Sequence, residues 1–148
     1  MADTGYNWGS FLEFAVAATP VDGTAVADGA AITCDALDLD GYAACQVAVK
    51  VVEDNTGACD GNVYISVLSS DLDPDSEGFQ VGPTTGPVYT DAVASAGIID
   101  PVQNTTRTTS FSINPAQISK FKLHVLNDGG QELAVTANYR LATIPAAS

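Results

Sequence analysis

The stretch 121-FKLHVLNDGGQELAVTANYRL-141 decides the fold of this chain. Successive side chains of a β-strand point to opposite faces, so apolar residues at every second position predict a half-buried strand. Both sides of the turn sequence 127–130 show this pattern, with Phe121, Leu123 and Val125 before it and Leu133, Val135, Ala137, Tyr139 and Leu141 after it. Asn, Asp and Gly adopt turn conformations that other residues resist. The stretch therefore predicts a C-terminal β-hairpin.

The same alternation occurs upstream in three further segments, 45–52, 62–69 and 107–113. The first and third segments carry apolar residues mainly on one face, which is typical of half-buried strands. The second segment is apolar on one face and mixed on the other, the two faces being Val63, Ile65 and Val67, and Tyr64, Ser66 and Leu68. We therefore expect the strand over 62–69 to make contacts on both sides.

Weaker strand patterns cover 11–19, 31–40 and 78–90, where turn residues interrupt the apolar positions. No apolar repeat with a spacing of 3.6 residues is long enough to predict a full helix. Short helical turns are expected only at 114–119, where an Asn-Pro pair favours a helix start, and at 91–97.

Seven or eight short strands with many turn residues predict an all-β chain, folded as an antiparallel β-sandwich. A jelly roll is the expected type, and an immunoglobulin-like sandwich is the second choice. A length of 148 residues fits one domain with one core. We expect a single sandwich domain over 11–148, preceded by an extended N-terminal arm over 1–10.

The composition excludes several classes of function. A formal net charge of −13 would repel a phosphate backbone, so we expect no nucleic-acid partner. The N-terminus has no basic segment, and Glu13 interrupts its only apolar run, Phe11–Ala18. This pattern predicts neither a signal peptide nor a membrane span, and it favours synthesis in the cytoplasm.

The cysteines and the single histidine predict no zinc site. A closed zinc site needs four nitrogen or sulfur ligands at short paired spacings, but Cys34, Cys45 and Cys59 are far apart and His124 is the only imidazole. We expect an exposed or interfacial His124. In a reducing compartment the three cysteines would be small buried hydrophobic residues, while one disulfide with one free thiol stays open as an alternative.

The stronger of two weak candidates for a metal site is the set of acidic residues at alternate positions of 71–77, namely Asp71, Asp73, Asp75 and Glu77. Calcium prefers such oxygen-rich loops, but the EF-hand pattern fails because Ser76 replaces the required Gly and Gly82 replaces the required Glu. A solvated acidic turn is the favoured interpretation. The acidic residues of 35–40 are a weaker candidate still, and we expect no cofactor.

Enzymatic activity is not expected. The sequence has no G-x-S-x-G nucleophile motif and only one histidine to act as a general base. A carboxylate pair for glycoside hydrolysis is not excluded by counting, because eighteen acidic residues offer many pairs. Activity as a small hydrolase is nevertheless the least supported class.

The residues that favour protein binding are aromatic or basic. Tyr6, Trp8 and Phe11 make the arm region too aromatic for a terminal segment without contacts. We therefore expect the arm to dock on a neighbouring chain. The alternative is that Trp8 folds back onto its own sandwich. Strand edges with few charges favour a homo-oligomer that covers them. Cations available for acidic patches on a partner are Lys120, Lys122 and Arg140.

The aromatic arm and the ending ISKFKLHVLNDGGQELAVTANYRLATIPAAS resemble small virion structural proteins of tailed bacteriophages, above all the decoration or cement proteins. This resemblance implies a sandwich or jelly-roll fold and a homotrimer on the outer surface of the capsid. It also implies that the partner is the major capsid protein, that neighbouring capsomers are bridged, and that synthesis takes place in the host cytoplasm.

A second class of function is a carbohydrate-binding or adhesive module of a phage fibre or tail. Sugar platforms need exposed aromatic side chains, and the candidates are Tyr6, Trp8, Tyr42, Tyr64 and Tyr89. Such a module would bind sugar as an isolated protein, whereas a decoration protein would need the assembled lattice.

Overall fold

The computed structural model describes residues 5–54, 57–69 and 93–145, and the described part is all-β. Its short strands are β1 (Asn7–Trp8), β2 (Leu12–Glu13), β3 (Ala15–Val16), β4 (Thr19–Pro20), β5 (Thr24–Val26), β6 (Ala31–Thr33) and β7 (Leu37–Asp38). Its longer strands are β8 (Ala44–Val52), β9 (Asn62–Leu68), β10 (Val93–Ile99), β11 (Thr106–Ile113), β12 (Lys120–Asp128) and β13 (Leu133–Thr143). No helix forms within these residues.

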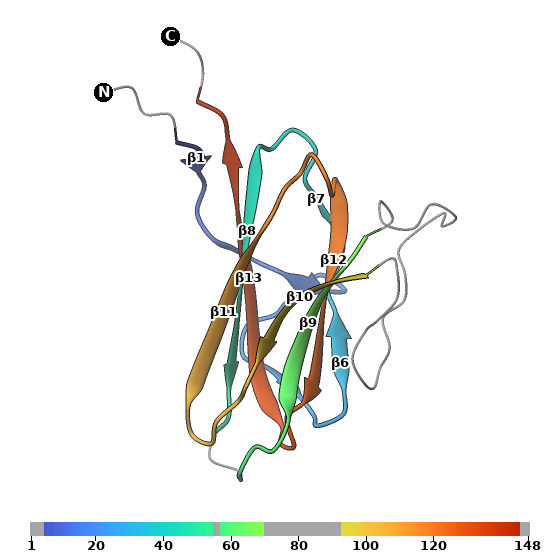
Figure 1. The fold of residues 1–148 in the computed structure, drawn as a ribbon, viewed down its shortest axis with the longest axis vertical. Helices are drawn as coiled ribbons and strands as arrows, with labels where there is room; N and C mark the ends of the chain where they lie inside the picture. The colour runs from blue at the N-terminus through green and yellow to red at the C-terminus, as the bar shows by residue number, and fades with distance from the viewer. Residues whose placement is uncertain (1–4, 55–56, 70–92, 146–148) are drawn as a thin grey trace.

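Two antiparallel sheets pack face to face as a sandwich (Figure 1). The first sheet has the order β1-β13-β8-β11, with β2 and β5 pairing on β13 as well. The second sheet has the order β10-β9-β12-β6, with β7 also pairing on β12. This arrangement confirms the predicted antiparallel sandwich and is consistent with a jelly-roll-like fold.

The predicted C-terminal hairpin is wrong, although both of its strands are present. β12 lies in the second sheet and pairs with β9, whereas β13 lies in the first sheet and pairs with β8. The turn therefore carries the chain from one sheet to the other. The buried side chain of Asn127 holds this connection, because its Nδ2 donates to the carbonyl oxygens of Val26 (2.9 Å) and Gln131 (2.7 Å). Its Oδ1 accepts a hydrogen bond from the Gly129 amide (2.9 Å).

The core fills the space between the two sheets and follows the predicted alternation. In β8 the inward side chains are buried and those between them are half-buried or exposed, the inward set being Cys45, Val47, Val49 and Val51. The facing strand β12 contributes the fully buried Phe121, Leu123 and Val125. Burial of these side chains is the main term that stabilises the sandwich.

The outer face of the second sheet is buried around its centre. Ser66 and Leu68 are buried on β9, which confirms the expected contacts on both faces of that strand. His124 on β12 is also buried, so the predicted exposed position is wrong. The reason is that this face of β9 and β12 is covered: Ser66, with which His124 pairs directly, is buried, and so is Leu126 two residues along β12. The His124 Nδ1 lies 3.1 Å from the Thr33 hydroxyl.

The predicted strand over 11–19 is broken into β2, β3 and the start of β4, and the chain turns sharply between β3 and β4. Ala17 and Ala18 both have a positive φ, at 48° and 66°. The Asp35 carboxylate accepts a hydrogen bond from each of their amides at 2.9 Å. The predicted strand over 31–40 is likewise split, into β6 and β7.

The predicted helical turn over 91–97 is wrong, because β10 runs antiparallel to β9 from Val93 onward. Pairing with a long neighbouring strand overrides the weak helical preference of an Ala-rich segment. At 114–119 a single turn forms, in which the Asn114 side chain accepts a hydrogen bond from the Ala116 amide (3.0 Å). The predicted strand over 78–90 lies outside the described residues. The described residues contain no helical segment with the length and hydrophobicity that a bilayer crossing requires.

Candidate functional site

The N-terminal arm extends the chain's own first sheet. Asn7 and Trp8 form β1, which pairs with Thr143 and Ala142 of β13. The Gly9 amide continues this contact by donating to the Leu141 carbonyl at 2.9 Å. Of the two alternatives for the arm, the structure therefore favours the fold-back onto its own sandwich. β1 and the end of β13 lie together at one end of the molecule (Figure 1).

The Arg140 guanidinium lies close to two aromatic rings, that of Trp8 on β1 and that of Phe11. The carbon Cζ of Arg140 lies 4.4 Å from the centre of the Trp8 ring and 5.1 Å from that of Phe11. The Arg140 Nε donates a 2.7 Å hydrogen bond to the Gln46 amide oxygen. Tyr6 packs edge-on against Trp8 at a centroid distance of 6.1 Å.

We call this group of Tyr6, Trp8, Phe11 and Arg140 the arm patch. Its aromatic side chains are exposed, with accessible fractions of 50% for Tyr6, 37% for Trp8 and 49% for Phe11. All four members are among the residues that the sequence predicts for an interface. The structure therefore brings four of those residues onto one surface.

A pocket adjoins the arm patch between β1, the start of β8 and the end of β11. Its volume is about 390 Å³, and its lining residues are Tyr6, Trp8, Ala43, Ala44, Ser112, Ile113, Asn114 and Gln117. Its lining combines two aromatic rings with the hydroxyl of Ser112 and the amides of Asn114 and Gln117. Such a surface can combine stacking with hydrogen bonds to a neutral polar ligand.

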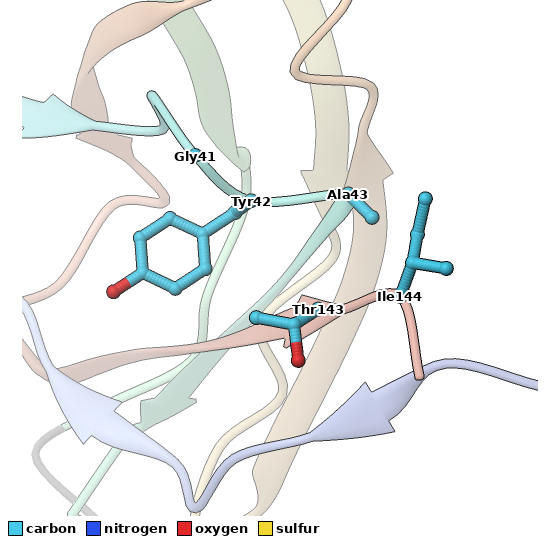
Figure 2. A pocket seen from close by; sticks show the side chains of 5 residues that line it. All are labelled: Gly41, Tyr42, Ala43, Thr143 and Ile144. Carbon is cyan, nitrogen blue, oxygen red and sulfur yellow. The ribbon is translucent and has the colours of Figure 1, made fainter. Parts of the chain in front are cut away.

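A second hollow, which we call the end hollow, shares Ala43 with this pocket. It has a volume of about 320 Å³ and is lined by Gly41, Tyr42, Ala43, Thr143 and Ile144. Figure 2 shows Tyr42 and Ile144 on opposite sides of the hollow, with Ala43 and Thr143 between them. Tyr42 is 41% exposed and Ile144 is 73% exposed. Exposed apolar side chains thus gather in two adjoining depressions at one end of the sandwich.

The other two basic residues of the predicted interface lie away from the arm patch. Lys120 and Lys122 belong to β12 of the second sheet. In the strand register Lys120 lies opposite Asp38 of β7, and Lys122 lies opposite Leu68 of β9. Arg140 lies on β13 of the first sheet. The structure therefore does not bring these three cations together, and a role for the lysines stays a prediction.

The candidate calcium ligands Asp71, Asp73, Asp75 and Glu77 lie outside the described residues. The acidic residues of 35–40 are described, and two of them hold the backbone in place. Asp35 accepts hydrogen bonds from the β3–β4 turn, and the Asp38 carboxylate accepts one from the Asp40 amide at 2.9 Å. Within the described ranges no group of His, Cys, Asp and Glu side chains is arranged to hold a metal ion.

All three cysteines are free thiols, and two of them are core residues. Cys34 and Cys45 are buried, while Cys59 is half-buried. Burial raises the pKa of the Cys34 and Cys45 thiols to about 12, and the Asp35 carboxylate adds to the effect at Cys34. At neutral pH these thiols are protonated, so they act as small apolar side chains rather than as nucleophiles or ligands.

Sequence reasoning missed the end hollow and the polar residues that line the pocket. Ile144 follows the last residue of β13, and the alternation of a strand gives no sign that such a residue lies beside Tyr42. Asn114 and Gln117 belong to the turn that was recognised for its Asn-Pro pair, but their closeness to Trp8 depends on the pairing of β1 with β13. No local pattern encodes that pairing.

Comparisons with known proteins support the fold only. A search with protein-family models finds no match, and a search of curated proteins finds none either. Among solved structures, tripeptidyl peptidase 2 matches 93% of this chain with a TM-score of 0.52 and 8% identity, and the match covers 10% of that protein.

Two further structures match with lower TM-scores. A structure of xylanase 10B from Clostridium thermocellum, with CBM22-1 and GH10 modules and xylohexaose, matches 95% of this chain and 27% of its own at a TM-score of 0.48 and 14% identity. A structure of infectious bursal disease virus, Gx strain, matches 97% of this chain with a TM-score of 0.48 and 12% identity. The match covers 33% of that viral chain. This chain spans a tenth to a third of these three proteins. The match to tripeptidyl peptidase 2 shows a shared fold alone, because the identity is only 8%.

Proposed function

We propose that this chain is a non-enzymatic structural protein of a virion, which decorates an assembled phage capsid and stabilises it by bridging neighbouring capsomers. On this proposal its partners are the major capsid protein and sister copies in a trimer, and its location is the outer surface of the capsid. The end of the sandwich that carries the arm patch and the end hollow is the binding surface.

The observation that carries the proposal is the gathering of exposed apolar side chains at that end. Tyr6 and Trp8 line the pocket, Tyr42 and Ile144 line the end hollow, and the two depressions share Ala43. Contiguous exposed apolar side chains are typical of protein interfaces. Aromatic residues and arginine are also the types that dominate the energetics of such interfaces.

Stabilisation of a shell by such a protein follows from mass action. A protein that binds the assembled shell, but not its separated parts, raises the free energy of disassembly by RT ln(1 + [L]/Kd) per site. At a free concentration of 100 Kd this is about 2.7 kcal/mol for each site. Binding as an oligomer adds avidity, so modest contacts at each protomer are sufficient.

The direct test is co-sedimentation of the purified protein with heads of the parent virus that lack it. We expect wild-type protein to sediment with the heads in a fixed ratio to the capsomers, and Trp8→Ala to sediment at least tenfold more weakly. Ile98→Ala is the matched control, because Ile98 is also an exposed apolar residue (58%) but lies on β10 of the second sheet. Absence of wild-type protein from the pelleted heads would contradict the proposal.

A second candidate function is carbohydrate binding, and the pocket beside the arm patch favours it. Trp8 and Tyr6 offer stacking surfaces, and Ser112, Asn114 and Gln117 offer hydrogen-bonding groups in the same pocket. Sugar sites combine apolar stacking with a few placed polar groups in this way. On this alternative the chain would be an adhesive module of a fibre or tail.

A glycan array with the isolated protein separates the two candidates. Carbohydrate binding predicts selective retention of one sugar class by wild-type protein, and loss of that retention in both Trp8→Ala and Gln117→Ala. Capsid decoration predicts no retention on the array together with binding to heads.

A further inference from the structure

Arg140 is a cation without a carboxylate partner in the described part of a strongly acidic chain. The chain has eighteen acidic residues and only five Lys and Arg. The partners of the Arg140 guanidinium are one amide oxygen, on Gln46, and two aromatic rings, of Trp8 and Phe11. None of these partners neutralises its charge.

Among the described residues, Arg140 is hydrogen-bonded through Nε only. A guanidinium has five N–H donors, and the bond to Gln46 uses the single one on Nε. The centres of the Trp8 and Phe11 rings lie 4.4 and 5.1 Å from the guanidinium carbon. The four N–H groups of the two terminal nitrogens therefore remain for a ligand, and two such nitrogens form the fork that binds a carboxylate through two parallel hydrogen bonds.

We propose that Arg140 is a carboxylate receptor, which binds an Asp or Glu side chain on the surface of the protein partner. This inference rests on the proposed capsid-binding function and names the chemistry of the surface that is recognised. Trp8 and Phe11 are positioning residues for the guanidinium, and their exposed parts contact apolar groups beside the bound carboxylate.

Charge favours a single carboxylate on a protein over other anions. A net charge of −13 repels a polyanion such as a nucleic acid or an anionic membrane as a whole. One carboxylate that meets a held guanidinium gains a short-range, charge-assisted pair of hydrogen bonds at little cost in side-chain ordering. The exposed Phe11 ring, 49% accessible, suits an apolar side chain of a protein rather than the hydroxyl groups of a sugar.

Glu13 provides a control within the chain for the charge dependence of carboxylate binding at Arg140. It pairs with Asn138, two residues before Arg140 on β13. Its negative charge opposes an incoming carboxylate. Residues two positions apart along a strand lie roughly 7 Å apart, and two like charges at that separation in water repel each other enough for about a twofold to threefold change in affinity. Glu13→Gln should therefore bind an acidic peptide more tightly than wild type does.

The test uses Trp8 fluorescence, which reports on this site alone because Trp8 is the only tryptophan of the chain. The full-length protein is titrated with the blocked peptide acetyl-Leu-Gly-Glu-Gly-Leu-amide, with its Glu-to-Gln counterpart, and with glucuronic acid. We expect the glutamate peptide to bind at least tenfold more tightly than the glutamine peptide. Arg140→Gln should abolish this difference, and Lys120→Gln, a charge-matched control on the second sheet, should retain it.

Each outcome decides between the alternatives. If the wild type binds the two peptides equally, or binds neither of them, the inference is overturned. If it binds glucuronic acid more tightly than either peptide, the choice of a protein partner is overturned. Far-UV circular dichroism and urea unfolding of each variant separate loss of the site from loss of the fold.

Head binding tests the inference independently of the proposed function. If Arg140→Gln sediments with heads as well as wild type does, the carboxylate receptor is contradicted while the capsid-binding function stands. If wild-type protein selects the glutamate peptide but does not sediment with heads, the capsid-binding function is contradicted while the receptor stands.

Discussion

At the scale of single residues, Trp8 and Arg140 depend on each other. The ring of Trp8 lies against the guanidinium, and Ala142, the β13 residue that pairs with Trp8, is fully buried. The arginine in turn is anchored on Gln46 of β8. The pair therefore ties the arm to the first sheet as well as forming the arm patch.

A double-mutant cycle measures this dependence. We expect Trp8→Leu, Arg140→Gln and the double variant to show a coupling of about 0.5–1 kcal/mol in the free energy of unfolding, the range for a cation–π contact at a partly exposed site. Urea titration followed by circular dichroism gives the three values. The control cycle pairs Arg140→Gln with Tyr42→Leu and should show no coupling. A coupling near zero for Trp8 and Arg140 would show that their contact contributes nothing to stability.

A second prediction at this scale concerns the turn between β3 and β4. Ala18 has a φ of 66°, a left-handed conformation that costs a residue with a Cβ atom roughly 1–2 kcal/mol. Glycine avoids this cost but loses more backbone entropy on folding, so Ala18→Gly should stabilise the protein by about 0.5 kcal/mol. A higher urea midpoint is the expected readout. Ala48→Gly in the middle of β8 is the matched control and should lower the midpoint, and a lower midpoint for Ala18→Gly would contradict the account.

At the scale of elements, alternation in the sequence identifies the long strands but not their partners. β8, β9, β11, β12 and β13 all lie where the period of two predicts them. The period fixes which side chains face inward, and it contains no information about which strand lies next to which. For this reason β12 and β13, adjacent in sequence across a turn of Asn, Asp and Gly, were expected to pair and instead lie in opposite sheets.

For the candidate site too, the sequence identifies the members but not how they are arranged in space. Tyr6, Trp8, Phe11 and Arg140 are recognisable from their residue types alone, because aromatic and basic side chains are unusual in this Ala-rich, acidic chain. Their gathering into the arm patch depends on the register that pairs Trp8 with Ala142. Lys120 and Lys122 have the same residue-level signal but lie on the other sheet, so type alone does not predict membership of the patch.

The connection between the sheets supplies the prediction at this scale. Asn127 is fully buried and its side chain makes three hydrogen bonds, two as a donor and one as an acceptor. Asn127→Ala leaves buried backbone groups without these partners and should destabilise the protein by about 3 kcal/mol. Thermal or urea unfolding measures the loss.

Asn138→Ala is the matched control for Asn127→Ala. The Oδ1 of Asn138 is buried without a hydrogen-bond partner, so its removal loses no satisfied acceptor and should cost much less. Equal losses at the two positions would contradict a special role of Asn127 in the connection.

At the scale of the whole molecule, the buried thiols link stability to alkaline pH. The pKa of Cys34 and of Cys45 is about 12 in the folded chain, against 9.0 for an unperturbed thiol, because burial disfavours the thiolate. Above pH 9 the unfolded chain releases these protons while the folded chain retains them, so the unfolded state is favoured. The contribution of both thiols is fully present below pH 9 and is lost as the pH rises towards 12.

We therefore expect the free energy of unfolding to fall between pH 8 and pH 10 under reducing conditions. The variant with Cys34→Ala and Cys45→Ala should lose a smaller part of its stability over the same interval, whatever its absolute stability. Parallel urea titrations at the two pH values give the comparison. An identical pH dependence of the variant and the wild type would show that the thiols do not cause the fall.

The largest-scale claim is that one end of the sandwich, bearing the arm patch and the end hollow, docks on an assembled shell. Hydrogen–deuterium exchange of the free protein and of the head-bound protein, digested and compared peptide by peptide, tests this claim most directly. The account predicts protection on binding in peptides that cover 6–12, 42–44 and 140–144, with unchanged exchange in β10. Protection centred on β10, or no difference between the two samples, would contradict it.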